Sequence, residues 1–195
     1  GRTSQLLRRL AEEGHASFED EEIRINVAYS TARFIRPDKW RNEQRGFYLL
    51  PPPPHTHFGF LLPIEDNQWI LSLGARGDHT PPRDEAGLKA YAKGLPEPDV
   101  WDRIKDAEIV GGVRTFRKPT ASRRLLWEAE KWPERLLVIG DAMSSVNPTY
   151  GQGMTVAALE ADALRDMLGK REASTTAEHR LDGLPAEYFP AAREI

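Results

Sequence analysis

Two glycine-containing segments in the last third of the sequence combine residue types that could hold a ligand. Gly140-Asp141 follows an apolar run, and Gly151 and Gly153 lie directly before an alanine-rich run. Glycine permits a positive φ and lets a ligand approach the backbone without meeting a Cβ. If a helix begins after Gly153, its first N–H groups have no partner inside the helix and carry the positive end of its dipole. The spacing therefore predicts a site for an electron-rich ligand.

A strand and a helix must position these glycines. Leu136 to Ile139 is a short apolar run with Val and Ile, which is typical of a strand buried on both faces. From Met154 to Leu164, apolar residues recur at three- and four-residue steps around most of the circumference, which predicts a buried helix. Ligands of α/β sheets bind beyond the carboxyl ends of the strands, where Gly140-Asp141 would lie.

The rest of the chain predicts a sheet with helices around it. Residues 2–14 read as a helix capped by Thr3 or Ser4 and ended by Gly14, and residues 22–35 alternate as a strand with one solvent-facing side. The further predicted strands are 45–50, 56–64, 68–75 and 108–117. Pro119 would close the last of them, and Arg123 to Trp127 would either extend that strand or begin another element. The strand at 22–35 and the first three of these further strands form an antiparallel meander with turns at Pro51 to Pro54 and Glu65 to Asn67. Helices are predicted at 84–94, 98–107 and near 177–181 and 186–195.

This order is that of a sheet domain inserted into an α/β domain whose first part would lie upstream of Gly1. The composition agrees with a globular protein of 195 residues, 39% hydrophobic and 29% charged. Its 27 basic residues are outnumbered by 30 acidic ones, so we expect no nucleic-acid partner. There is no cysteine, and no apolar run approaches the roughly 20 residues that span a bilayer, so we expect a cytoplasmic protein.

Ile139-Gly-Asp-Ala142 together with Asn147-Pro-Thr-Tyr-Gly-Gln-Gly-Met154 resembles the second FAD-binding motif of the single-component FAD monooxygenases, the flavoprotein aromatic hydroxylases, and most of all their epoxidase-type members. The opening residues Gly1 to Ser4, with the helix behind them, resemble the stretch after the middle motif of this family. The resemblance covers nearly the whole chain.

The resemblance implies FAD as the cofactor and NAD(P)H as its reductant. Oxygen would add to the flavin as a hydroperoxide, and a small apolar organic substrate would be hydroxylated or epoxidised. Because the cofactor carries this chemistry, no catalytic side chain and no metal ligand is predicted. Asp141 would bind the ribityl chain. The cofactor-binding residues would be Gly140, Asp141, Pro148, Gly151, Gln152, Gly153 and Met154.

The family's Gly-x-Gly-x-x-Gly motif, which holds the ADP half of FAD, is absent from the sequence. We therefore expect the C-terminal part of a Rossmann-like FAD-binding domain carrying an inserted antiparallel substrate domain, inactive by itself. The expected divisions are 1–20 and 121–170 for the FAD domain, 21–120 for the substrate domain and 171–195 for a helical tail. The alternatives are a flavin-dependent reductase or halogenase, or a non-catalytic module that does not bind FAD. The substrate, the choice of NADH or NADPH and the oligomeric state stay open.

Other residues with chemical potential carry weaker signals. His55 and His57 could lie on one strand face but lack a third metal ligand, and Asp78-His79 reads as a loop with a helix cap. Ser144-Ser145 lacks the glycine-flanked elbow of hydrolases, and Arg123-Arg124 could meet a nucleotide phosphate or face solvent. A minority of the sheet aromatics could form a substrate wall, with the others in the core: Tyr29, Phe47, Tyr48, Phe58, Phe60, Trp69 and Phe116.

Overall fold

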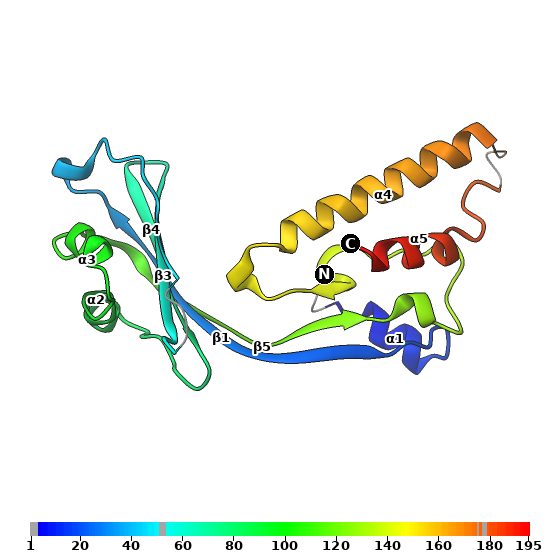
Figure 1. Cartoon of the computed structure of the whole chain (residues 1–195), viewed down its shortest axis with the longest axis horizontal. Coiled ribbons are helices and arrows are strands. Elements are labelled where there is room, and N and C mark those ends of the chain that lie inside the picture. Colours follow the sequence, from blue (N-terminus) through cyan, green and yellow to red (C-terminus); the bar gives the residue numbers. More distant parts are fainter. Residues whose placement is uncertain (1–3, 51–53, 175, 177–178) are drawn as a thin grey trace. The chain divides into compact units, whose positions relative to one another are not determined.

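A computed structural model describes residues 4–50, 54–174, 176 and 179–195 (Figure 1). The chain separates into two compact units. Residues 25–119 form one, here called the sheet unit, and residues 1–24 with 120–195 form the other, here called the helical unit. The mixed α/β content predicted from the sequence is confirmed.

The strands form an antiparallel arrangement in the order β2-β3-β4-β1-β5-β6. Their bounds are β1 Asp20–Ile35, β2 Phe47–Leu49, β3 His57–Ile64, β4 Gln68–Arg76, β5 Ile109–Arg124 and β6 Ser144–Ser145. The predicted meander is confirmed for β2, β3 and β4, but β1 pairs with β4 and not with β2. Asp66 and Asn67 make the turn between β3 and β4 with φ of 58° and 53°, a conformation that Asn and Asp tolerate better than most residues. Of the predicted turn at Pro51 to Pro54, residues 51–53 lie outside the described part.

The predicted strand at 22–35 is confirmed as β1, but its buried face changes along its length. The pattern predicts one face made by Ile23, Ile25, Val27 and Tyr29, yet Ile23 is 70% exposed and the residues buried beyond Val27 are the even-numbered ones. Asn26 has a left-handed φ of 42°, and such a break in the pleat exchanges the two faces of a strand.

Two short helices cover one face of the sheet unit. They are α2 (Glu85–Lys93) and α3 (Asp99–Ile104), both within predicted ranges, and the Asp84 carboxylate caps α2 by accepting from Gly87 N at 2.8 Å. The cap is therefore Asp84 and not the Asp78-His79 pair, which lies in a loop. The core between these helices and the sheet contains Phe34, Leu61, Trp69, Leu71, Leu73, Leu88 and Ile104, all 0% exposed.

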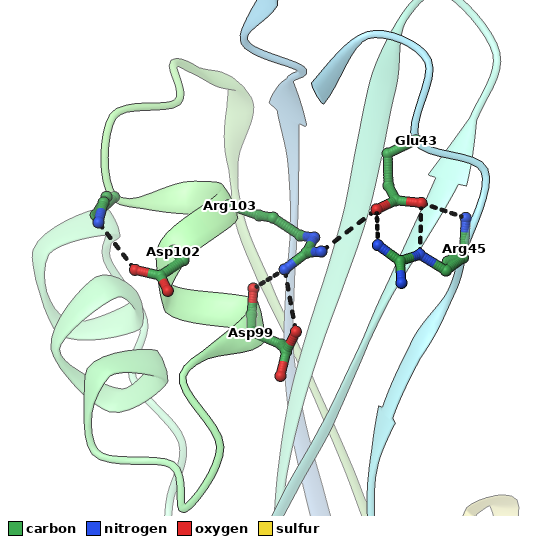
Figure 2. Close-up of polar contacts among 6 residues, drawn as sticks. Glu43, Arg45, Asp99, Asp102 and Arg103 are labelled. Atoms are coloured by element: carbon green, nitrogen blue, oxygen red, sulfur yellow. Dashed lines mark hydrogen bonds and ion pairs between the residues drawn. The ribbon is translucent and has the colours of Figure 1, made fainter. Parts of the chain in front are cut away.

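A buried arginine joins α3 to the loop that follows β1 (Figure 2). Arg103 is 5% exposed and donates to the Asp99 carbonyl at 2.9 Å, and its Nη2 lies 3.4 Å from the Glu43 carboxylate. Its guanidinium stacks 3.8 Å from the centre of the Phe47 ring. Glu43 in turn accepts two bonds from the guanidinium of Arg45 at 2.9 and 2.6 Å. These contacts attach an irregular loop, with its short helix η1 (Asp38–Trp40), to the rest of the sheet unit.

The helical unit contains α1 (Leu6–Glu12), α4 (Gly153–Ser174) and α5 (Leu184–Arg193), with short turns η2 (Leu126–Glu128), η3 (Gly140–Ala142) and η4 (Pro148–Tyr150). The helix predicted at 2–14 is confirmed as α1, with Ser4 Oγ accepting from Leu6 N and Gly14 ending it at φ 73°. The prediction at 186–195 is confirmed as α5, whereas the described residues of 177–181 form turns. The core of this unit is Leu7, Leu126, Val138, Met143, Tyr188, Phe189 and Ala192.

Three predictions are wrong, two of them around the glycine loops and one in β5. Residues 136–139 are not a strand, because the described residues supply no strand that pairs with them, and Ile139 is 42% exposed. The helix from Met154 exists but is mostly exposed, since few described residues pack on it. Pro119 does not end β5, which continues to Arg124 and pairs with β6 beyond the proline, at Ser122 and Arg123.

Candidate functional site

The Gly140-Asp141 loop is held by a buried carboxylate. Residues 136–139 lead into η3, where Gly140 takes a φ of 60° that a residue with a side chain would adopt only under strain. The N–H of Gly140 donates to the Glu160 carboxylate of α4. Glu160 is 1% exposed and lies on the inward-facing side of α4. The loop is therefore fixed to the first half of α4.

Burial of Glu160 raises its pKa, and the hydrogen bond from Gly140 opposes this rise. Tyr188 of α5 is fully buried nearby, and its hydroxyl has no hydrogen-bond partner among the described residues. Burial raises the pKa of Tyr188, and the negative charge of Glu160 raises it further. Glu160 thus places a titratable group under the loop, in an environment that disfavours its charge.

A second attachment comes from the end of β5. The Arg124 guanidinium donates to the carbonyl of Ala142, and Arg124 N donates to the carbonyl of Met143 at 2.9 Å. Its guanidinium also lies 3.7 Å from the Asp20 carboxylate, while Arg123 lies 3.4 Å from Glu21. Both arginines therefore have acidic neighbours, and Arg124 positions the loop.

The second glycine loop leads directly into α4. Asn147 Oδ1 accepts from Thr149 N at 3.0 Å and caps η4, after which Gly151 turns the chain with φ 66°. A Cβ placed on Gly151 would meet nothing within 4 Å, so the backbone is open to a ligand there. A Cβ placed on Gly153 would lie 3.9 Å from Asp141 Oδ1. The Asp141 carboxylate therefore lies beside the N-terminus of α4.

The structure brings the predicted site residues together on these two loops and the first turn of α4. Gly140 and Gly153 are half-buried, and Met154 is 85% exposed. The other members are exposed: Asp141, Pro148, Gly151 and Gln152. The arrangement offers backbone donors at the positive end of a 22-residue helix next to one carboxylate acceptor. Their contact with a cofactor stays a prediction.

Two residues that position this site were missed by sequence reasoning. Arg123-Arg124 stood out only as a charged pair, and the bond from Arg124 reaches Ala142 across 18 residues. Glu160 is the only charged residue between Gly151 and Ala161, and that isolated charge in an apolar helix is the signal that could have found it.

Other residues with chemical potential lie in the sheet unit. The ring of His57 lies 5.0 Å from the rings of both His79 and Tyr91. Burial lowers the pKa of His57, with a smaller contribution from His79. No group of three His, Asp or Glu residues suited to a metal occurs within the described residues, and none of their helices is long and apolar enough to cross a membrane.

The sheet aromatics divide between core and surface. Trp69 and Phe58 are buried, whereas Tyr48 and Phe116 are 63% and 45% exposed. Tyr29 packs edge-on against Phe58 with ring centres 5.4 Å apart, on the sheet face opposite to α2 and α3. This face carries aromatic surface that an apolar ligand could use.

Comparison with known proteins found no matching family model. The chain is 27% identical to Protein Rv3254 of Mycobacterium tuberculosis over 174 residues, 89% of this chain and 36% of that protein. A triple mutant of the flavin-dependent brominase Bmp2 superimposes with a TM-score of 0.63 at 18% identity, over 97% of this chain and 45% of its own. OxyS, an anhydrotetracycline hydroxylase from Streptomyces rimosus, gives a TM-score of 0.52 at 19% identity, over 99% and 35%.

The chain has the fold of part of the flavin-dependent brominase Bmp2 and of the hydroxylase OxyS. It spans less than half the length of each relative named above. The expected resemblance to FAD-dependent monooxygenases is thereby confirmed at the level of the fold. The halogenase alternative shares the same support.

Proposed function

We propose that this chain supplies the ring- and ribityl-binding part of an FAD-dependent, NAD(P)H-using monooxygenase that acts on a largely apolar organic molecule. The observation that carries the proposal is the Asp141 carboxylate beside Gly153 at the N-terminus of α4, on a fold shared with the flavin-dependent brominase Bmp2. Because the relatives are more than twice as long, the activity is proposed for a polypeptide of their length that contains this chain.

The residues present fit part of the cofactor. The open backbone at Gly151 and the N–H groups at the start of α4 would face the electron-rich edge of the flavin ring, where a helix N-terminus stabilises negative charge by roughly 0.3 to 2 kcal/mol. Asp141 would accept hydrogen bonds from ribityl hydroxyls. When bound, the flavin would supply the redox chemistry with NAD(P)H and oxygen. The sequence has no Gly-x-Gly-x-x-Gly loop, so the residues present do not account for binding of the ADP half.

The test uses the protein translated from the full reading frame that contains this chain. We expect it to purify with bound FAD and to consume NAD(P)H and oxygen together, yielding an oxygenated product. Asp141→Asn should weaken FAD binding by about 10- to 100-fold, because it removes a charged acceptor. Asp162→Asn is the matched control, since Asp162 is an exposed acid on α4 whose ion pair among the described residues is with Arg165. A colourless protein that takes up no FAD would favour the non-catalytic module.

Halogenation is the second candidate, favoured by the fold likeness to Bmp2 and to the halogenase CmlS, whose TM-score is 0.57. The same reaction run with bromide or chloride and followed by mass spectrometry separates the two. A product that gains a halogen supports the halogenase, a product that gains oxygen supports the monooxygenase, and reduction of the substrate alone would identify a reductase.

A further inference from the structure

A concave site lies on the sheet unit, on the face opposite to α2 and α3. Arg33 of β1 pairs directly with Ile70 of β4, and their neighbours Phe34 and Trp69 point into the core. Since successive side chains of a strand point to opposite faces, Arg33 and Ile70 point away from the helices. Together with the start of β5 they line a pocket of about 640 Å³, a volume typical of small-molecule sites.

Two guanidinium groups line this pocket without an acidic partner. Arg33 and Arg114 are both exposed, and neither forms an ion pair with any described residue. The pocket lining contains no carboxylate. Arg33 Nη2 lies 3.9 Å from the point where a Cβ of Gly111 would stand, and Gly111 has a φ of 84°. The glycine therefore keeps the space beside the guanidinium open.

The remaining walls of the pocket are apolar. Ile70, Val110 and Val113 line it, and the hydroxyl of Thr31 is already engaged with Ser72 Oγ at 2.7 Å. Isolated surface arginines usually face only water. Here two of them share a concave surface with branched aliphatic side chains, and that combination matches a molecule with one anionic end and a hydrocarbon body.

We propose that this pocket binds a small organic acid, with its carboxylate at Arg33 and Arg114 and its hydrocarbon part against Ile70, Val110 and Val113. Arginine suits a carboxylate because its planar fork can donate two parallel hydrogen bonds. The site goes beyond the proposed flavin chemistry and does not depend on it, since every residue involved belongs to the sheet unit.

The experiment is a calorimetric titration of the 195-residue chain with 2-naphthoate and with its neutral isostere 2-naphthamide. We expect the acid to bind at least about 10-fold more tightly than the amide, the effect of a charge-assisted bond at a solvent-accessible site. Arg33→Gln and Arg114→Gln should each weaken naphthoate binding by a similar factor and leave naphthamide binding unchanged. Arg24→Gln is the matched control, since Arg24 is an exposed arginine on the same strand that does not line the pocket.

Nuclear magnetic resonance of the ¹⁵N-labelled chain locates the bound molecule. Naphthoate should shift the amide signals of Gly111 and Gly112, which line the pocket. Equal binding of acid and amide, unchanged affinity in both arginine variants, or shifts confined to residues outside the pocket would overturn the proposal. Because both arginines are exposed, the variants should keep the melting temperature of the wild type, which circular dichroism checks.

Discussion

The sheet unit and the helical unit differ in how completely they bury their apolar residues. In the sheet unit, Trp69, Leu71 and Leu88 are all 0% exposed between strands and helices of the same unit. In the helical unit, Met154 and Leu159 of α4 are 85% and 49% exposed. The most buried described side chain of α4 is a carboxylate, Glu160.

The two units differ in which side chains they leave exposed. Apolar side chains that gather on an exposed helix mark a surface for contact with another molecule or segment. Met154 is one of the residues we propose to contact the flavin, and contact with a cofactor requires such exposure. The sheet unit buries its own apolar core, so its side chains that could bind a ligand lie in a pocket on its surface.

The largest expected contrast is between two leucines, one from each unit. Leu71→Ala should lower the free energy of unfolding by about 2 to 5 kcal/mol, because it leaves a cavity in a closed core. Leu159→Ala should change it by no more than about 0.5 kcal/mol, because Leu159 packs little. Urea unfolding followed by tryptophan fluorescence measures both. Similar losses would mean that the two units are equally well packed.

The next largest effect is expected at Glu160. Two substitutions separate its role as a hydrogen-bond acceptor from its role as a titratable group. Glu160→Ala should cost about 1 to 3 kcal/mol, because the N–H of Gly140 loses its acceptor. Glu160→Gln keeps an acceptor and removes the titration. Burial raises the pKa of Glu160 above 4.5, so the carboxyl favours folding at low pH and loses that effect as pH rises through its folded pKa.

The wild type should therefore lose stability as pH rises above about 4.5 in a way that Glu160→Gln does not. Hydrogen exchange, followed separately for residues 1–24 with 120–195 and for residues 25–119, locates the effect. We expect it in the helical unit alone. Parallel pH profiles of wild type and Glu160→Gln would contradict a buried, titrating carboxylate.

A smaller contrast compares two glycines of the helical unit. Gly140→Ala should cost about 1 to 2 kcal/mol, because φ is 60° there, although the added Cβ would meet Ala157 only at an ordinary 3.5 Å. Gly169→Ala should instead stabilise by about 0.5 to 1 kcal/mol, since Gly169 lies inside α4 with open space around it. Thermal unfolding should show melting temperatures that move in opposite directions. A shift of the same sign would show that the loop does not need its left-handed glycine.

Sequence reasoning succeeded where the information was local. The strands β3 and β4, the turn at Asp66 and Asn67 and the end of α1 at Gly14 each depend on residues close together in the chain. It failed where a distant partner decides the outcome. Residues 136–139 have strand composition but no pairing strand among the described residues, so composition alone misled.

The candidate site shows the same limit. The glycines and Asp141 could be chosen from spacing, since a strand-like run, a turn and a helix start follow one another in sequence. The bonds of Glu160 and Arg124 could not be predicted from spacing, because they reach backbone atoms 20 and 18 residues away, although the isolated charge in an apolar helix marks Glu160 itself. Binding of FAD by Asp141 and its neighbours stays a prediction.

The last expected effect, a loss of stability in acid, belongs to Glu43 of the sheet unit (Figure 2). Hydrogen bonds from Arg45, then Arg103, lower the pKa of Glu43 from 4.5 to about 2 against the effect of burial. A lowered folded-state pKa contributes stability above about pH 4.5 that is lost as pH falls toward 2.

Glu43→Gln should therefore flatten this acid loss in residues 25–119, while Glu97→Gln, at an exposed carboxylate with no ion pair to a described residue, should leave it as in the wild type. The urea midpoint, measured between pH 2 and pH 6, gives the comparison. Because the Glu160 profile has the opposite sign, each unit would carry its own pH signature, the sheet unit weakening in acid and the helical unit as pH rises. A single common profile for both units would show that they unfold together.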